Sequence, residues 1–333
     1  MHHINPRIAT VIPLYNGAKY IRVALQSVLN QNLMPSQIIV VNDGSTDDGP
    51  AIVEEMAKQH PITLLHRENG GQSAARNFGV AHSDTELIAL LDQDDIWYPN
   101  HLEGLVDQFR QPNTIELGWV YSNLDEIDEM GNVVVRSVLR MVSTPHPKRD
   151  LFGCIGTDMF VLPSATVLSR RAFDAVGGFD ERLSGFEDDD LFLRMFRKGY
   201  DNVYIDLALS QWRIYNHSAS FSPRMARSRM IYFRKLVEMC PNEPARDRYL
   251  TRDFVAPRFF PWLVREYTEA LSRRDRRAVR TACENLAYAA SLHKPKVRWA
   301  MKLLLPLMRQ SALASRCLPL VRVSRPLMRR LLR

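Results

Sequence analysis

Cysteine is scarce in this sequence of 333 residues, and the few cysteines lie far apart. The four of them form no CxxC pair and no cluster; they are Cys154, Cys240, Cys283 and Cys317. Zinc sites and thiol redox sites need closely spaced cysteines, so the sequence argues against both kinds of chemistry. Residues 1–14 also lack the charged and apolar segments of a secretory signal. We therefore expect a cytoplasmic protein in a reducing compartment.

Long apolar runs and two nucleotide-binding patterns are also missing. No uncharged apolar run approaches the roughly 20 residues that a membrane-spanning helix needs. The sequence contains neither GxGxxG nor the P-loop pattern GxxxxGK followed by Ser or Thr. Their absence argues against a dinucleotide cofactor and against P-loop nucleotide hydrolysis.

No acidic residue follows Glu284, although eleven lysines and arginines do. Subtracting these eleven charges from the net charge of +7 leaves the first 284 residues at −4. Basic residues in the tail are interspersed with tryptophan and leucine, a pattern that suits an anionic membrane interface. We predict that residues 221–333 form a basic helical region that binds the inner face of the cell membrane peripherally. Packing on the rest of the chain or on another subunit is the alternative.

The first 110 residues alternate between strand and helix patterns. Strand patterns separated by single helix patterns predict a parallel α/β sheet; they cover residues 7–14, 37–41, 62–66 and 87–91. Such sheets bind ligands at the carboxyl ends of their strands. Polar residues stand at all four of these positions: Tyr15 and Asn16, Asp43, residues 68–72, and Asp92 and Asp94. The sequence therefore predicts one binding site along this edge.

Beyond residue 110 the pattern is less regular. Residues 125–136 are typical of a hairpin, and residues 203–205 and 207–214 of two short strands. Residues 153–160 contain glycine and follow no period, which predicts a mobile loop over the site.

Three carboxylates follow the strand pattern at 87–91: Asp92, Asp94 and Asp95. Crowded carboxylates raise one another's pKa unless a cation joins them. Hard oxygen ligands suit Mg²⁺ or Mn²⁺, so we predict a divalent cation here. The alternative is a solvated acidic turn that caps the helix after Pro99.

A second acidic cluster, EDDD at residues 187–190, begins a predicted helix. Acidic residues complement the dipole at a helix N-terminus, which is a sufficient structural explanation for one or two of them. Four in succession exceed what capping requires. One of them could therefore face a cleft and act as a base.

Six segments resemble the family 2 glycosyltransferases, inverting enzymes of GT-A fold that include bacterial polysaccharide and lipopolysaccharide sugar transferases. In order they are TVIPLYN (10–16), VVNDGSTD (40–47), ENGGQSAARNFGV (68–80), LLDQDDIWYP (90–99), GGFDE (177–181) and EDDDLFLR (187–194). The resemblance runs from about residue 8 to residue 220. It implies a Rossmann-like, mixed and mostly parallel sheet flanked by helices, with a C-terminal α-helical extension.

The same resemblance divides the chain. A catalytic domain at 1–220 would comprise a nucleotide-binding half at 1–110 and an acceptor half at 111–220. Residues 221–333, which the resemblance does not cover, would be the basic helical region.

The resemblance also assigns roles at the donor side. Pro13, Tyr15 and Asn16 would line the base and ribose pocket, Asp43 would accept the imide N–H of uracil, and Arg76 would lie beside the nucleotide. Asp92 and Asp94 match the DxD motif. Asp92 would face ribose and metal, and Asp94 would bind Mn²⁺ or Mg²⁺, which neutralises the leaving diphosphate. Asp95 would lie behind them and cap the following helix.

On the acceptor side, Asp188 matches the general base of the family and Glu187 its orienting neighbour. The base would take the proton of an acceptor hydroxyl during a single displacement, which inverts the anomeric centre. Arg213 and His217 resemble a late arginine and histidine that meet diphosphate and metal. The surrounding WRIYNH departs from the usual spacing, so His217 is equally explained as a surface histidine.

The resemblance implies transfer of a sugar from a nucleotide-sugar, with a UDP-sugar favoured, to a hydroxyl of a glycan or lipid-linked acceptor in cell-surface polysaccharide synthesis. A nucleotidyltransferase that makes a nucleotide-sugar is the first alternative, but it needs a basic glycine-rich loop after the first strand, where only Lys19 is found. A nucleic-acid binder is the second, suggested by the sequence pI of about 9.3. The basic charge is confined to the tail, so we expect no nucleic-acid partner.

Overall fold

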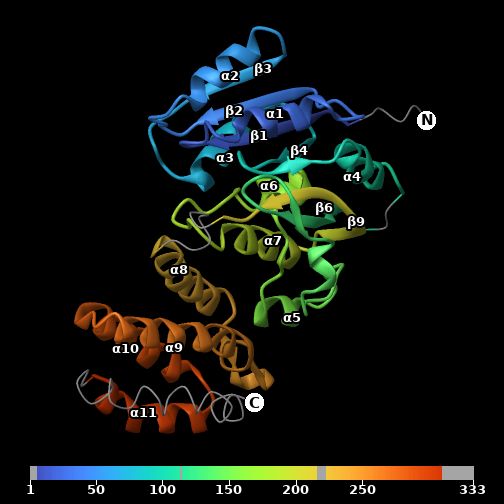
Figure 1. Ribbon diagram of the computed structural model, residues 1–333. Helices are drawn as coiled ribbons and strands as arrows, with labels where there is room; N and C mark the ends of the chain where they lie inside the picture. The colour runs from blue at the N-terminus through green and yellow to red at the C-terminus, as the bar shows by residue number, and fades with distance from the viewer. Residues whose placement is uncertain (1–5, 113–114, 216–222, 310–333) are drawn as a thin grey trace. The chain divides into compact units, whose positions relative to one another are not determined.

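The computed structural model describes residues 6–112, 115–215 and 223–309. The chain divides into two compact units: unit 1 is Met1–Leu151 with Asp158–Met225, and unit 2 is Phe152–Thr157 with Ala226–Arg333. Unit 1 contains a large sheet with helices on it, and unit 2 is mainly helical (Figure 1). None of the helices in the described part of the chain combines the length and the apolar character that crossing a bilayer requires.

The sheet of unit 1 has nine strands within the described residues, in the order β3-β2-β1-β4-β8-β6-β9-β5, with β7 paired to β6. The strands are β1 (Ile8–Leu14), β2 (Gln37–Asn42), β3 (Ile62–His66), β4 (Leu87–Leu90), β5 (Ile96–Trp97), β6 (Leu117–Ile127), β7 (Val133–Val135), β8 (Thr166–Ser169) and β9 (Asp201–Arg213). Strands β1 to β4 pair in parallel, as predicted. Strand β8 runs antiparallel to both β4 and β6, which makes the sheet mixed.

Helices connect these strands. They are α1 (Ile21–Leu29), α2 (Gly49–Ala57), α3 (Gln72–Ala81), α4 (His101–Phe109), α5 (Leu151–Gly156), α6 (Arg170–Ala175) and α7 (Glu187–Arg197). Short 3₁₀ turns lie at Val138–Arg140 and Pro163–Ala165. Each helix among the first four strands forms a crossover between parallel strands, the arrangement that the alternating pattern predicts.

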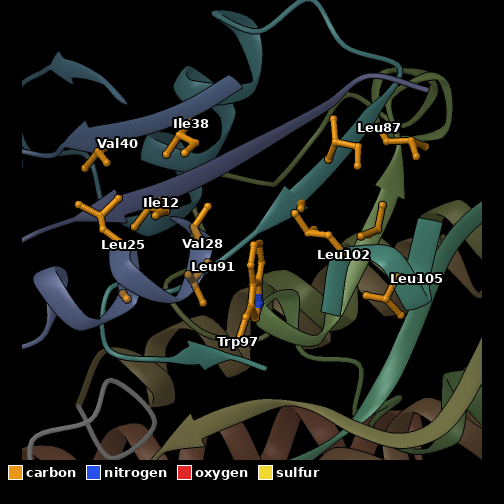
Figure 2. Packing of buried hydrophobic residues seen from close by; sticks show 14 of the residues in the cluster. Ile12, Leu25, Val28, Ile38, Val40, Leu87, Leu91, Trp97, Leu102 and Leu105 are labelled. Atoms are coloured by element: carbon orange, nitrogen blue, oxygen red, sulfur yellow. The ribbon is translucent and has the colours of Figure 1, made fainter. Parts of the chain in front are cut away.

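The main core of unit 1 lies between one face of the sheet and helices α1 and α4. Leu25 and Val28 of α1 face Ile12 of β1, because apolar residues three and four apart share one side of a helix (Figure 2). Trp97 and Leu102 continue this core toward the middle of the sheet.

Helix α3 covers the opposite face of β1 and β2. Its residue Gly79 lies so close to the sheet that a Cβ atom there would stand 2.4 Å from Cγ1 of Val11 and 2.9 Å from Cγ2 of Val41. Ala75, one turn earlier, is also fully buried against this face. Small residues on α3 therefore let its first turn approach the carboxyl ends of β1 and β4, where the site lies.

Two predictions for residues 111–220 need correction. Strand β9 is continuous, and its pairing with β6 shifts so that Ser122 pairs with Ile205 and Asn123 with Ala208. This bulge explains why the sequence predicts two strands. Residues 153–160 are not a loop throughout, because α5 ends only at Gly156. The hairpin predicted at 125–136 is confirmed by the antiparallel pairing of β6 with β7.

Unit 2 contains α5 from Phe152 onward and α8 (Pro223–Met239) from Ala226 onward. Its other helices are α9 (Ala256–Ser272), α10 (Arg276–Leu292) and α11 (Pro295–Arg309). A π-helical turn at Thr251–Val255 precedes α9, and a two-stranded pair joins β10 (Asn242–Glu243) to β11 (Arg248–Tyr249). Phe233 of α8 stacks on Phe259 of α9 with ring centroids 4.9 Å apart, and Tyr288 of α10 meets Phe233 edge-on at 5.5 Å. These rings form an aromatic core in unit 2.

His101, the first residue of α4, is completely buried beside the main core of unit 1. Its ring stacks on Trp97 with centroids 4.3 Å apart, and its Nδ1 donates to the carbonyl oxygen of Leu209 at 3.1 Å. Among the described residues, Nε2 has no hydrogen-bond partner. Burial lowers the pKa of His101 from 6.5 to about 3, because a protonated ring would carry an unpaired donor in the core.

We expect the free energy of unfolding to fall as the pH drops below 6.5. In this range His101 is protonated in the unfolded chain, whereas in the folded protein it stays neutral down to about pH 3. At about 1.4 kcal/mol for each pH unit, the loss from this residue should reach about 2 kcal/mol near pH 5. Urea titrations measure this. His101→Asn keeps a donor for Leu209 but cannot titrate, so it should lose about 2 kcal/mol less over the same range. Equal losses in the two proteins would contradict the assignment.

Candidate active site

A cleft of about 720 Å³ lies in unit 1 at the carboxyl ends of β1, β2 and β4. Ten residues that the sequence predicts as site residues line it: Pro13, Tyr15, Asn16, Asp43, Arg76, Asp92, Asp94, Glu187, Asp188 and Arg213. His217 lies outside the described residues. The fold therefore brings the predicted donor side and the predicted acceptor side to one cavity.

Arg76 of α3 joins the two acidic motifs. Its side chain is 1% exposed, with Nη2 at 2.5 Å from Oδ1 of Asp92 and Nη1 at 3.1 Å from Oε1 of Glu187. Burial alone would lower the pKa of Arg76, but the charges of Asp92, Glu187 and Asp188 outweigh burial and raise it. The guanidinium therefore stays a cation that holds together two carboxylates 95 positions apart in the chain.

The acids after β4 have different partners. Asp94 is partly buried and accepts a hydrogen bond from the Tyr215 hydroxyl at 2.9 Å. Burial, and then the charge of Asp92, raise the pKa of Asp94. Asp95 is fully buried and accepts the backbone N–H of Arg213 at 2.9 Å. The prediction that Asp95 caps the next helix is wrong, because Asn100 is the N-cap of α4.

The DxD turn is also held by its middle residue. The Gln93 side chain accepts the backbone N–H of Tyr15 at 2.8 Å and donates to the Tyr15 carbonyl oxygen at 3.1 Å. The turn after β1 and the turn after β4 are thereby fixed to each other. The Tyr15 ring remains 45% exposed at the cleft, where it could stack on a planar ligand.

The charges and donor atoms of Asp92 and Asp94 decide whether they could hold a divalent cation. Across the described residues, no three His, Cys, Asp or Glu side chains gather as a metal site. Mg²⁺ commonly takes only one or two protein carboxylates and completes its shell with substrate phosphates and water. Burial and the charge of Asp92 disfavour the ionised form of Asp94, and a cation beside these two carboxylates would stabilise it. The residues therefore fit such an ion.

The four acids at the start of α7 point to separate partners. Glu187 is buried and bound by Arg76 and by the amide of Gln72. Asp189 accepts the backbone N–H of Met159 at 2.7 Å, and Asp190 pairs with Arg194 at 2.7 Å. Asp188 lines the cleft. Of these four acids, Glu187 binds Arg76, Asp189 fixes the segment at Met159 and Asp190 pairs within the helix. Asp188 is left at the cleft.

Asp188 has the environment of a base. Burial raises its pKa well above the usual range of an aspartate, and the charges of Glu187, Asp158 and Asp189 add to the rise. One of its oxygens, Oδ1, accepts the backbone N–H of Asp189 at 2.8 Å. A carboxylate with a raised pKa binds a proton more strongly, which is the property that proton abstraction from an alcohol requires.

Asp43, which follows β2, lines the cleft beside the turn that precedes α3. It is 2% exposed, and its carboxylate accepts the backbone N–H groups of Gly70 at 3.0 Å and Gly71 at 2.7 Å. Nε of Arg67 lies 3.2 Å from Oδ1. The Gly70 N–H also lies 3.2 Å from Oδ2, so these contacts take up about the four lone-pair sites that a carboxylate has. A further donor would have to replace a long contact such as the one with Arg67.

Arg213 lies at the cleft, but its guanidinium is engaged by the backbone. Nε donates to the carbonyl oxygen of Asp94 at 2.8 Å, and Nη1 donates to that of Asp128 at 2.9 Å. The group also lies 4.7 Å from the ring centre of Tyr20. Arg213 therefore fixes the DxD turn to the β6–β7 hairpin.

The sequence-based prediction assigns no role to three residues of the site, although it places Gln72 in the polar segment 68–72. Gln72, Gln93 and Tyr215 each bind a predicted site residue or its backbone. All three lie inside or beside the motifs, in ENGGQ, DQD and WRIYNH. Their position inside or beside a motif is the signal that could have identified them.

Known proteins resemble this chain in sequence. A family profile described as Glycosyl transferase family 2 matches residues 10–177. An uncharacterized glycosyltransferase of Rickettsia bellii is 29% identical over 228 residues, which make up 65% of this chain and 31% of the relative. Chondroitin synthase of Escherichia coli is 29% identical over 195 residues, 58% of this chain and 27% of the relative. The chain thus spans about a third or less of the length of these relatives.

Solved structures share the fold. S. aureus TarS 1-349 in complex with UDP-GlcNAc has a TM-score of 0.62 and 17% identity, covering 91% of this chain and 88% of that one. The mannosyltransferase PcManGT from Pyrobaculum calidifontis, in complex with GDP-Man and Mn²⁺, has a TM-score of 0.56 and 18% identity, covering 95% of this chain and 85% of that one. This likeness confirms the predicted fold class.

We expect Arg76→Met to lower the free energy of unfolding of unit 1 by about 3 to 5 kcal/mol, because both carboxylates that pair with Arg76, buried Glu187 and Asp92, lose their cation. Adding Glu187→Gln to that variant should recover part of the loss, since one uncompensated charge is then removed. The matched control is Arg22→Met, whose pair with Glu55 is exposed and should be worth less than about 1 kcal/mol. Urea unfolding measures all three. An Arg76→Met loss no larger than the control's would refute the bridge.

Proposed function

Because the chain belongs to glycosyl transferase family 2, we propose that its cleft binds a nucleotide-sugar and transfers the sugar to an acceptor hydroxyl with inversion. One observation carries this proposal. Arg76 contacts both Asp92 of the DxD turn and Glu187 beside Asp188, so the donor carboxylates and the base line a single cleft. A displacement needs both groups at one sugar, on opposite sides of the anomeric carbon.

The donor in this proposal is a UDP-sugar. Asp43 would accept the imide N–H of uracil in place of its long contact with Arg67, while Tyr15, Pro13 and Asn16 would line the base and ribose pocket. The solved relatives support a nucleotide-sugar in general, since their titles name UDP-GlcNAc for TarS and GDP-Man for PcManGT. Asp43 would accept the imide N–H of thymine equally well, so the choice of uracil rests on the resemblance to the family.

Asp94 and Asp92 are the residues that would hold Mn²⁺ or Mg²⁺, with Tyr215 orienting Asp94 through its hydroxyl. When bound, such an ion supplies positive charge that stabilises the departing nucleoside diphosphate. Arg76 supplies a further fixed positive charge beside Asp92. Arg213 near the diphosphate and His217 on the metal stay predictions from the resemblance.

On the acceptor side, Asp188 takes the proton of the attacking hydroxyl. Glu187 is bound by Arg76 and Gln72, and its charge raises the pKa of Asp188. Glu187 therefore strengthens the base without contacting the acceptor. Attack from the side of Asp188 inverts the anomeric centre.

The acceptor in this proposal is a glycan or lipid-linked hydroxyl in cell-surface polysaccharide synthesis. Relatives named chondroitin synthase support a polysaccharide product. We keep the division into a catalytic domain at 1–220 and a basic helical region at 221–333 as part of the same proposal.

We expect Asp188→Asn to lower kcat by about 10² to 10⁴, because the base can no longer accept a proton while the donor site is intact. Asp94→Asn should lose activity together with the dependence of donor binding on Mn²⁺. Asp174→Asn, an exposed substitution on α6 that does not line the cleft, is the control and should be unchanged. Release of UDP from a UDP-sugar reports turnover. Near wild-type transfer by Asp188→Asn would remove that residue from the mechanism.

The donor base is tested by thermal unfolding with Mn²⁺ and different nucleoside diphosphates. At about 100 times its dissociation constant, UDP should stabilise the protein by about 2.7 kcal/mol. CDP presents the N3 acceptor of cytosine where uracil presents its imide N–H, so CDP should stabilise the protein far less; Asp43→Asn, whose amide can donate to N3, should remove most of the preference between UDP and CDP. Stabilisation by CDP alone would show that the uracil assignment is wrong, while stabilisation by neither would count against the cleft as a donor site.

A further inference from the structure

Helix α11 of unit 2 carries an exposed apolar stripe. Trp299, Leu303 and Leu307 are four residues apart, so they lie on one side of the helix. They are 67%, 55% and 54% exposed. The opposite side of α11 is already packed, because Val297 and Met301 are buried and the Met308 carbonyl oxygen accepts the Tyr267 hydroxyl at 3.1 Å. The stripe is therefore not needed to hold α11 in unit 2.

The same helix is basic. Lys296, Arg298, Lys302 and Arg309 are exposed, and α11 contains no acidic residue. Within the part of the chain that the structure describes, none of these four side chains forms an ion pair. At 100° per residue, Arg298, Lys302 and Arg309 fall together on one flank of the stripe. An apolar stripe with a basic flank matches a helix lying in the plane of an anionic interface.

We propose that α11 docks on an anionic lipid bilayer. The indole and leucine side chains enter the boundary between headgroups and acyl chains, and the basic flank meets lipid phosphates. A second copy of this chain fits less well. Pairing through the same stripe would place the basic flanks of two helices near each other, and the sequence offers no acidic residue after Glu284 to compensate them.

This inference goes beyond the proposed function and does not depend on it. The sequence predicts membrane binding for residues 221–333 as a whole, and this inference assigns that binding to one face of α11. A chain held on a bilayer would meet a lipid-linked acceptor at the surface where that acceptor is embedded.

Sedimentation of the 333-residue chain with vesicles tests the proposal. We expect binding to vesicles of phosphatidylcholine with phosphatidylglycerol, little binding to phosphatidylcholine alone, and weaker binding at about 1 M salt, where charges are screened within about 3 Å. Leu303→Glu should weaken binding at least about tenfold, because the leucine no longer leaves water. Lys302→Gln should weaken it about fivefold, the effect of one basic residue near the surface.

Leu207→Glu is the matched control. Leu207 lies on β9 in unit 1 and is 61% exposed, so the substitution is chemically the same on another surface and should leave vesicle binding unchanged. Wild-type binding by both α11 variants, or equal binding to neutral and anionic vesicles, would overturn the proposal. Light scattering adds a further outcome. If Leu303→Glu converts a dimer to a monomer and leaves vesicle binding unchanged, the stripe is an interface between copies and the proposal is wrong.

Discussion

The site depends on one buried cation. Removing a guanidinium from water is costly unless carboxylates surround it, and Arg76 has Asp92 and Glu187 within 3.1 Å. The helix that carries Arg76 can reach them because Gly79 lets α3 lie directly on β1 and β2. Packing of a small residue against the sheet thus decides where two acidic motifs from distant parts of the chain meet.

The same charges set the chemistry of the neighbouring acids. Asp94 and Asp188 both have raised pKa values, each mainly because of burial and then because of a nearby carboxylate. Arg76 binds the neighbour in each case, Asp92 for the first and Glu187 for the second. Among the described residues, Asp94 and Asp188 therefore line the cleft without an arginine of their own. Asp94 is suited to binding a cation, and Asp188 is suited to accepting a proton.

Sequence reasoning predicted the parallel strands β1 to β4 and the residues at their carboxyl ends, because alternation and turn residues are local signals. It also placed all ten described site residues in one cleft. It did not predict the partners that orient them, such as Tyr215 on Asp94, since a contact across 121 positions leaves no periodic trace. The continuity of β9 was hidden for a related reason: a bulge disturbs the alternation that marks a strand.

A crystal structure with Mn²⁺ and a UDP-sugar analogue that cannot transfer its sugar tests the central claim most directly. The account predicts the ion on Asp94 and Arg76 still bonded to both Asp92 and Glu187. It also predicts Asp188 on the side of the anomeric carbon opposite the diphosphate. A nucleotide bound outside this cleft, or Asp188 on the same side as the diphosphate, would contradict it.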